Sequence, residues 1–96
     1  MIIFNKTKKV NKLVDDIFRR TNVNKKTWVF SFSLTGKEAR KYKRETHLIG
    51  NCVYFRLKSM GYDVSIWSCS IGNSSIYLQR EHDYIKFDMN IVPNND

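Results

Sequence analysis

The sequence has few of the residues that build disulfide frameworks and metal sites. Its two cysteines, Cys52 and Cys69, lie 17 positions apart and form no Cys-x-x-Cys pair. The two histidines, His47 and His82, stand in different segments. Zinc sites need closely spaced groups of such ligands, and disulfide-rich domains need more cysteines. We therefore expect two free thiols, no bound metal and no cofactor.

Long apolar runs are absent as well. No stretch reaches the roughly 18 apolar residues of a membrane-spanning helix, and the first ten residues, MIIFNKTKKV, contain no apolar segment of signal-peptide length. No internal repeat or low-complexity tract interrupts the chain, which is 42% hydrophobic and 14% aromatic. These features predict one cytoplasmic domain over residues 1–96, with a core spanning about 8–92, a frayed tail at 93–96 and no membrane partner.

Acidic residues are scarce in the first 60 positions. Residues 1–60 hold 15 Lys and Arg against 4 Asp and Glu, whereas residues 61–96 hold 2 against 5. The net charge of +8 is therefore concentrated in one part of the sequence. Such polarity is typical of a protein with one face for polyanions, although basic residues that only solvate helices would give the same count.

Hydrophobic periodicity predicts a helix and then a strand in the first third of the chain. From Thr7 onward, apolar residues recur at helical spacing: Val10, Leu13, Val14, Ile17 and Phe18. The segment WVFSFS, residues 28–33, alternates between large and small side chains. This period of two predicts a strand with Trp28, Phe30 and Phe32 against the core.

A second helix is expected after this strand. Thr35 and Glu38 match a capping box, in which the hydroxyl accepts a hydrogen bond from a free amide and the carboxylate reaches back to the cap. The helix would begin near Gly36 and extend to residue 45. It would carry five cations within eight residues.

The segment THLIGNCVYFRLKSMG, residues 46–61, allows two interpretations. As a helix it can be capped by Thr46 and ended by Gly61. It then presents an apolar arc made of Leu48, Ile49, Cys52, Val53, Phe55, Leu57 and Met60. Arg56 lies within this arc, where a charge is unexpected. The alternative takes residues 52–57, CVYFRL, as a strand on propensity alone.

A hairpin is predicted after Gly61. Residues 63–70, DVSIWSCS, and 75–81, SIYLQRE, have β-rich composition and are joined by the turn sequence IGNSS. Burial of the aliphatic set would place the remaining large side chains on the outer face. On this pattern, Val64 and Ile66 are buried, whereas Trp67 and Tyr77 are exposed. The segment YIKFDMNIV, residues 84–92, alternates in the same way and predicts one more half-buried strand.

The order of these elements resembles the winged helix-turn-helix family over residues 8–81. The most specific part is RLKSMGYDV…GNSSIYLQR, which is similar to the end of a recognition helix, a glycine and a β-hairpin wing. In size and charge the chain is also similar to the small single-stranded-DNA-binding winged-helix proteins of staphylococcal cassette chromosome mobile elements. The resemblance implies an α+β fold with three helices, a β-hairpin wing and one extra C-terminal strand.

The same resemblance implies a non-catalytic DNA-binding protein that serves replication or recombination of a mobile element, with single-stranded DNA favoured. A duplex-binding transcriptional regulator is the nearest alternative. The candidate contacts lie on the cation-rich helix, the exposed stripe of the recognition helix and the wing: Lys37, Arg40, Lys41, Lys43, Arg44, His47, Asn51, Tyr54, Lys58, Trp67, Asn73, Ser74, Tyr77 and Arg80. The extra strand at 84–92 would offer a contact to a second copy or to a replication protein.

The chemistry of these residues suits the expected roles. Clustered cations repel one another unless a polyanion compensates them, so phosphate contact is their natural use. An exposed Asn51 could read adenine, and Lys58 could reach phosphate or guanine. Outward Trp67 and Tyr77 could stack on unpaired bases.

Two further hypotheses come from other classes of protein. If residues 52–57 form a strand, the order resembles RelE-type ribonuclease toxins, which cleave RNA without metal. The catalytic candidates would then be Arg56, Arg80, His82 and Tyr84. The acidic last third would alternatively suit an inhibitor that binds a host protein.

Overall fold

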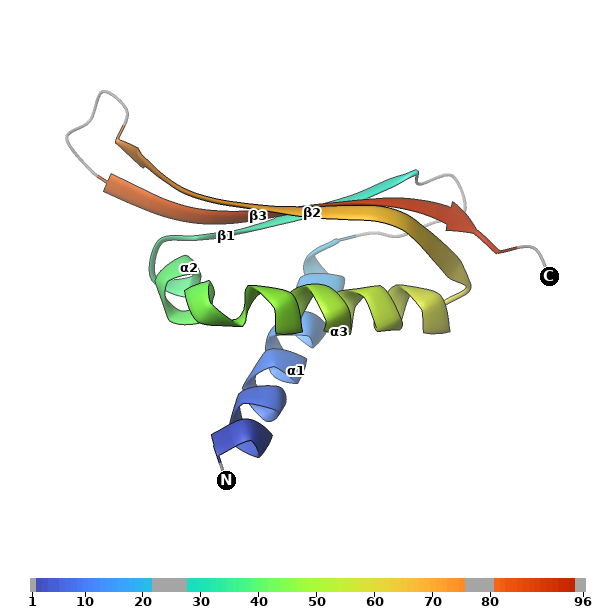
Figure 1. Cartoon of the computed structure of the whole chain (residues 1–96), viewed down its shortest axis with the longest axis horizontal. Coiled ribbons are helices and arrows are strands. Elements are labelled where there is room, and N and C mark those ends of the chain that lie inside the picture. The colour runs from blue at the N-terminus through green and yellow to red at the C-terminus, as the bar shows by residue number, and fades with distance from the viewer. Residues whose placement is uncertain (1, 22–27, 76–80, 95–96) are drawn as a thin grey trace.

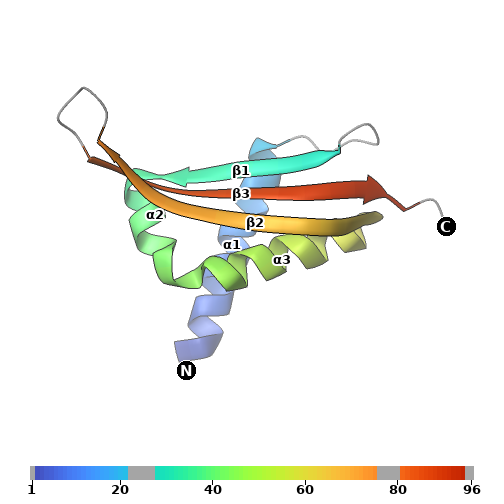
Figure 2. The ribbon, with the colours of Figure 1, turned by 45° about the horizontal axis from the view of Figure 1, so that its top comes forward.

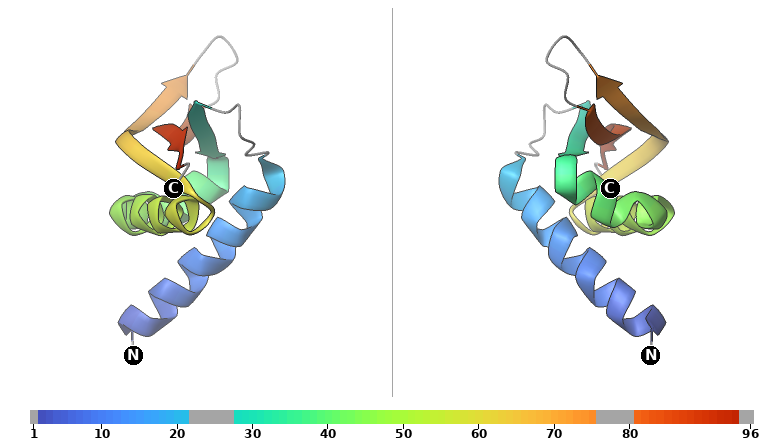
Figure 3. Two further views of the ribbon diagram at one scale, coloured as in Figure 1. Left: turned by 90° about the vertical axis from the view of Figure 1, so that its right-hand side faces the viewer. Right: turned by 90° about the vertical axis from the view of Figure 1, so that its left-hand side faces the viewer.

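The computed structural model describes residues 2–21, 28–75 and 81–94, and within them the side chains of 7–21, 28–72 and 83–94. In these residues, helices lie on one side of a three-stranded antiparallel sheet (Figure 1). The order is α1 (Ile2–Arg20), β1 (Val29–Thr35), α2 (Gly36–Tyr42), the 3-10 helix η1 (Lys43–Glu45), α3 (Thr46–Ser59), β2 (Tyr62–Ser75) and β3 (Glu81–Pro93). The N-terminal end of α1 projects away from the body of the molecule (Figures 1 and 3).

The strand order is β1-β3-β2, so the last strand forms the centre of the sheet (Figure 2). Every second residue of β3 is buried against the helices: Ile85, Phe87, Met89 and Ile91. The alternation expected for residues 84–92 is therefore confirmed. Its place as an extra strand beside a hairpin wing is wrong, because β1 and β2 both pair with it.

The fold is α+β, but the winged-helix prediction is wrong. β2 continues without a turn through the segment IGNSS, whose residues pair with Glu81–Ile85 of β3. Gly72 was expected in a turn, but it lies within β2 opposite Tyr84. A Cβ atom at this position would lie 2.4 Å from the Tyr84 hydroxyl oxygen. Its missing side chain makes room for the Tyr84 ring on the open face of the sheet. Most of the second predicted wing strand, 76–80, lies outside the described residues.

A β-bulge reverses the two faces of β2. The pairing with β3 shifts between Val64 and Ile66, and such an extra residue moves all later side chains to the opposite face. Trp67 consequently packs against the core, whereas Ile66 is 65% exposed. The prediction that Ile66 is buried and Trp67 points outward is thus wrong.

The predicted helical stripe of α1 and the helical interpretation of residues 46–60 are both confirmed. Val10, Leu13, Val14 and Ile17 are buried, as are Ile49, Val53 and Leu57 of α3. Gly61 follows α3 with a backbone φ of 94°, a conformation that ends helices and favours glycine. Two residues of the predicted apolar arc, Phe55 and Met60, are exposed instead.

The core between the layers is rich in aromatic rings. Phe30 stacks on Phe18 of α1 with centroids 5.1 Å apart, and Phe32 stacks on Phe87 of β3 at 4.6 Å. Phe30, Phe32 and Leu34 are buried as the alternation of β1 predicts. Trp28 was expected with them, but it lies just before β1 begins and is 67% exposed.

Candidate nucleic-acid interface

Charge is divided between the two layers. The helices, with η1, contain 13 Lys and Arg against 4 Asp and Glu, whereas the three strands contain 1 against 4. The asymmetry along the sequence therefore becomes an asymmetry in space, because the helices share one side of the sheet (Figure 1). A polyanion would meet favourable potential on the helical layer and little on the sheet.

The cation-rich segment, formed by α2 and η1, begins where the chain turns sharply at the end of β1. Gly36 has a φ of 60°, which lets the chain pass from β1 directly into α2. The predicted capping box is wrong, because Thr35 makes no side-chain cap hydrogen bond. Both carboxylate oxygens of Glu38 instead accept hydrogen bonds from Arg20 of α1, at 3.2 and 3.1 Å. This ion pair, with the bond from Arg20 to Asp16, raises the pKa of Arg20 above its ordinary value.

Most cations of α2 and η1 remain available. Lys37, Lys43 and Arg44 are exposed and form no ion pair with any residue that the structure describes. Lys41 lies over the ring of Tyr42, 5.4 Å from its centroid, and is also exposed. Arg40 differs, since it pairs with Asp83 of β3 at 3.2 Å. Four of the five predicted cations are thus free to meet phosphates.

Sequence reasoning missed a contribution from α1. Lys9 and Val10 of α1 and Lys41 of α2 line one hollow of about 150 Å³, together with Tyr42 and Glu45. The hollow brings a cation of α1 next to the cation-rich segment. Lys8 and Lys12 are also exposed on this helix. The signal was present in the sequence, because these lysines lie outside the apolar stripe, but their neighbour in the fold could not be inferred.

The exposed stripe of α3 is present as predicted, with one addition. His47, Asn51 and Lys58 are exposed, and Tyr54 is half-buried. The Lys58 amine lies 5.6 Å from the centroid of the Tyr54 ring. Phe55 packs edge-on against Tyr54 at 5.2 Å and is 65% exposed. An aromatic and cationic strip therefore extends along the outer side of α3.

Arg56, the unexpected charge in the apolar arc, joins two helices. Its guanidinium lies 2.7 Å from Asp15 of α1 and 5.5 Å from the centroid of the Phe18 ring. The charge is paired at the edge of the core and stacks on an aromatic face. This position is structural, and it lies on the helical side of the sheet, whereas Tyr84 lies on the opposite face. Two of the four catalytic candidates of the ribonuclease hypothesis, Arg56 and Tyr84, are therefore not brought together, while Arg80 and the side chain of His82 lie outside the described residues.

Of the residues predicted for a wing, the structure describes the side chain of Trp67 alone, and this ring packs against the core. Trp67 stacks on Phe87 with centroids 6.5 Å apart and lies against Gly50, where a Cβ atom would come within 2.6 Å of the indole. His47 packs edge-on against it at 6.5 Å. Asn73 and Ser74 belong to β2, but their side chains, like Tyr77 and Arg80 altogether, lie outside the described residues.

The central rows of the open face of the sheet are built from small polar side chains, whereas Val29 and Ile66 expose apolar side chains on either side of Asn90. On either side of β3, serines occupy matched positions: Ser31 and Ser68 flank Asp88, and Ser33 and Ser70 flank Lys86. The Ser31 hydroxyl donates a hydrogen bond to Asp88 at 2.5 Å. This face carries one cation and one anion at its centre, so it offers no attraction for a polyanion.

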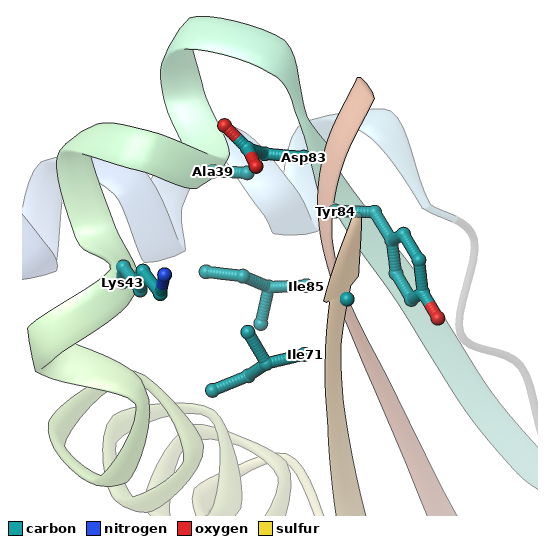
Figure 4. A pocket seen from close by; sticks show the side chains of 7 residues that line it. Ala39, Lys43, Ile71, Asp83, Tyr84 and Ile85 are labelled. Atoms are coloured by element: carbon teal, nitrogen blue, oxygen red, sulfur yellow. The ribbon is translucent and has the colours of Figure 1, made fainter. Parts of the chain in front are cut away.

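A hollow of about 270 Å³ lies between α2–η1 and the far ends of β2 and β3 (Figure 4). Ala39, Ile71 and Ile85 form an apolar floor, and Lys43 and Asp83 stand at its rim. Tyr84 points to the other side of the sheet (Figure 4). Asp83 is engaged by Arg40, so Lys43 supplies the available charge at this opening.

Nothing in the described parts of the chain adds a metal centre or a reactive thiol to this surface. Among the described residues, no group of three His, Cys, Asp or Glu is placed to hold a metal ion. Cys52 and Cys69 are free and half-buried, and burial raises the pKa of both thiols, against a smaller lowering effect of Arg56 on Cys52. A raised pKa leaves less thiolate for nucleophilic attack at neutral pH.

Comparisons with known proteins add no family. No protein-family model, no curated protein and no solved structure matches the chain. In the described segments, no helix has the length and apolar content needed to cross a membrane.

Proposed function

We propose that this protein is a non-catalytic nucleic-acid-binding protein that holds phosphates on its helical layer. The observation that carries the proposal is the separation of charge, with exposed unpaired cations on α2 and η1 and only one Lys or Arg against four Asp and Glu in the strands of the sheet. Clustered, unpaired cations are unfavourable alone, and a phosphate backbone compensates them with release of counterions. Lys9 at the shared hollow widens the basic surface towards α1.

The strip along α3 would contribute more than charge. Asn51 and Lys58 can donate hydrogen bonds to phosphates or bases, and Phe55 offers a ring for stacking on an unpaired base. Stacking on Trp67, which was the sequence-based reason to favour single strands, has no support because that ring packs against Phe87. The proposal therefore makes no choice between single-stranded and duplex DNA, and the binding titration below compares the two. A role in a mobile element and a cytoplasmic location stay predictions.

The ribonuclease alternative loses its main support. It requires residues 52–57 as a strand, and this segment belongs to α3. The inhibitor hypothesis has no specific observation in its favour.

A pair of variants tests the proposal. Removing two cations with Lys41→Gln/Arg44→Gln should weaken binding to all sequences alike, on the order of tenfold near physiological salt, and should reduce the slope of log K against log salt by about 1.5–2. Fluorescence anisotropy with a labelled single strand, a duplex and RNA across a salt series measures both quantities.

The control removes one charge from the other layer. Lys86→Gln should leave affinity and slope close to those of the wild type, whereas the single variant Arg44→Gln should not. Absence of binding to every nucleic acid at low salt would refute the proposal. Equal losses for Arg44→Gln and Lys86→Gln would refute the assignment to the helical layer.

A further inference from the structure

In the part of the chain that the structure describes, no strand pairs with the outer edge of β1, and this edge lacks the features that normally prevent strand pairing. β1 lies at one edge of the sheet, and its sequence, VFSFSLT, contains no charged residue and no proline. Its register with β3 is continuous over seven residue pairs, without a bulge. Edge strands of monomeric proteins are usually protected by lysines, prolines, bulges or a covering element. The opposite edge, β2, has both a bulge and Asp63.

The direction of the backbone hydrogen bonds defines which groups point outward. The Ile91 amide donates to the Trp28 carbonyl at 2.9 Å, in the same register that pairs Val29 with Asn90. In an antiparallel ladder, such bonded pairs alternate with non-bonded ones. Even-numbered residues of β1 therefore exchange bonds with β3. The N–H and C=O groups of Val29, Ser31, Ser33 and Thr35 point to the free edge.

The outward N–H and C=O groups of β1 can pair with the same groups of β1 in a second copy. A twofold axis beside Phe32 would set Ser31 opposite Ser33 of a second copy, and Val29 opposite Thr35. All four residues would then exchange both backbone hydrogen bonds, as in a narrow antiparallel pair. We infer that β1 pairs with β1 of a second copy, and that the protein forms a twofold dimer with one continuous six-stranded sheet.

Residues at the two ends of β1 also favour a second copy of the chain as the partner. Trp28, at the start, is 67% exposed, and Val29 is 51% exposed. Lys37, just beyond the other end, is exposed without an ion pair among the described residues. The twofold arrangement sets Trp28 of one copy opposite Gly36 of the other, next to its Lys37. An exposed indole and an exposed ammonium group are suited to a cation–π contact, so a second copy fits better than an unrelated strand.

The dimer does not depend on nucleic-acid binding, and it has a consequence for that function. Both copies would carry their helices on the same side of the extended sheet, because the pairing continues the sheet in its own plane. The two basic surfaces would then lie side by side. A dimer would therefore double the length of backbone that the protein contacts.

Mass measurement in solution without nucleic acid tests the inference. Light scattering after size exclusion should give about twice the chain mass of 11.4 kDa. Ser33→Pro should give the monomer mass, because it removes an outward N–H group at each of the two symmetry-related positions and spares the bonds to β3. Circular dichroism confirms that the variant is folded.

Charge variants make the register itself testable. Ser31→Lys/Ser33→Lys should give monomers, because lysines would face lysines across the axis, whereas Ser31→Lys/Ser33→Glu should remain dimeric. Ser68→Lys/Ser70→Lys is the matched control, since these serines flank Asp88 and Lys86 in the same way on the β2 side. It should remain dimeric. A wild-type monomer up to millimolar concentration would overturn the inference, as would a dimer that survives both Ser33→Pro and Ser31→Lys/Ser33→Lys.

Discussion

The helical layer and the open face of the sheet use opposite chemistry on the same small domain. The helices expose lysine, arginine and the Phe55 ring, while the central rows of the sheet expose serines on either side of Lys86 and Asp88. Both surfaces surround a single aromatic core, so neither pattern is required by packing. We infer that packing between the two layers stabilises the fold, and that the residues suited to binding lie on the helical layer.

The largest difference between the core and the surface is expected when a phenylalanine ring is removed from each. Phe87→Ala should lower the free energy of unfolding by about 3–5 kcal/mol, because the ring is fully buried and stacks on Phe32. Phe55→Ala should change it by less than about 0.5 kcal/mol. Urea unfolding followed by circular dichroism measures both values. Similar losses for the two variants would contradict the assignment of Phe55 to the exposed surface.

Two glycines, Gly50 between the layers and Gly72 on the open face of the sheet, extend the comparison to smaller effects. Gly50→Ala should cost about 1–3 kcal/mol, because the new methyl group would overlap the Trp67 indole, which is held by Phe87. Gly72→Ala overlaps the Tyr84 ring in the same way, but that ring lies on the open face and can turn into solvent. Its cost should be the smaller of the two. Thermal unfolding compares them, and the reverse order would place Trp67 outside the core.

The smallest expected effect concerns the joint between α1 and α3. Arg56→Ala removes a partly exposed ion pair with Asp15 and a cation–π contact with Phe18, for which about 1 kcal/mol is the upper range. Lys58→Ala, two residues later, removes only a contact to the Tyr54 ring and should cost less. Denaturation in low and high salt distinguishes them, since screening should reduce only the Arg56 contribution. Equal, salt-independent costs would contradict a role for this ion pair.

Local patterns predicted the helices and two strand faces, whereas non-local pairing decided the topology. The stripe of α1, the alternation of β1 and β3 and the glycine that ends α3 follow from periodicity and capping. The segment GNSS has the composition of a turn, yet it lies in β2 because Gly72 provides space for Tyr84 and β3 supplies pairing partners. No local signal reveals that choice.

In the candidate site, too, local patterns predicted some residues correctly, whereas others depend on non-local contacts. Exposed cations on α2 and η1 could be predicted because a short helix with five of them cannot bury them all. Trp67 could not be placed correctly, because one extra residue at the bulge reverses the face of every later side chain. Arg56 required knowledge of its partner, Asp15, which lies 41 positions away in the sequence. The contribution of Lys9 likewise depends on where α1 lies beside α2.

Amide chemical-shift mapping with a short labelled oligonucleotide tests the central claim most directly, since it reports both layers in one titration. The account predicts salt-sensitive shifts over Lys37–His47 and at Lys9, with a weaker response along the exposed side of α3. Ser33, Ser70 and Lys86 on the open face should stay unchanged. Shifts centred on that face, with α2 and η1 silent, would contradict the claim that the helical layer binds nucleic acid.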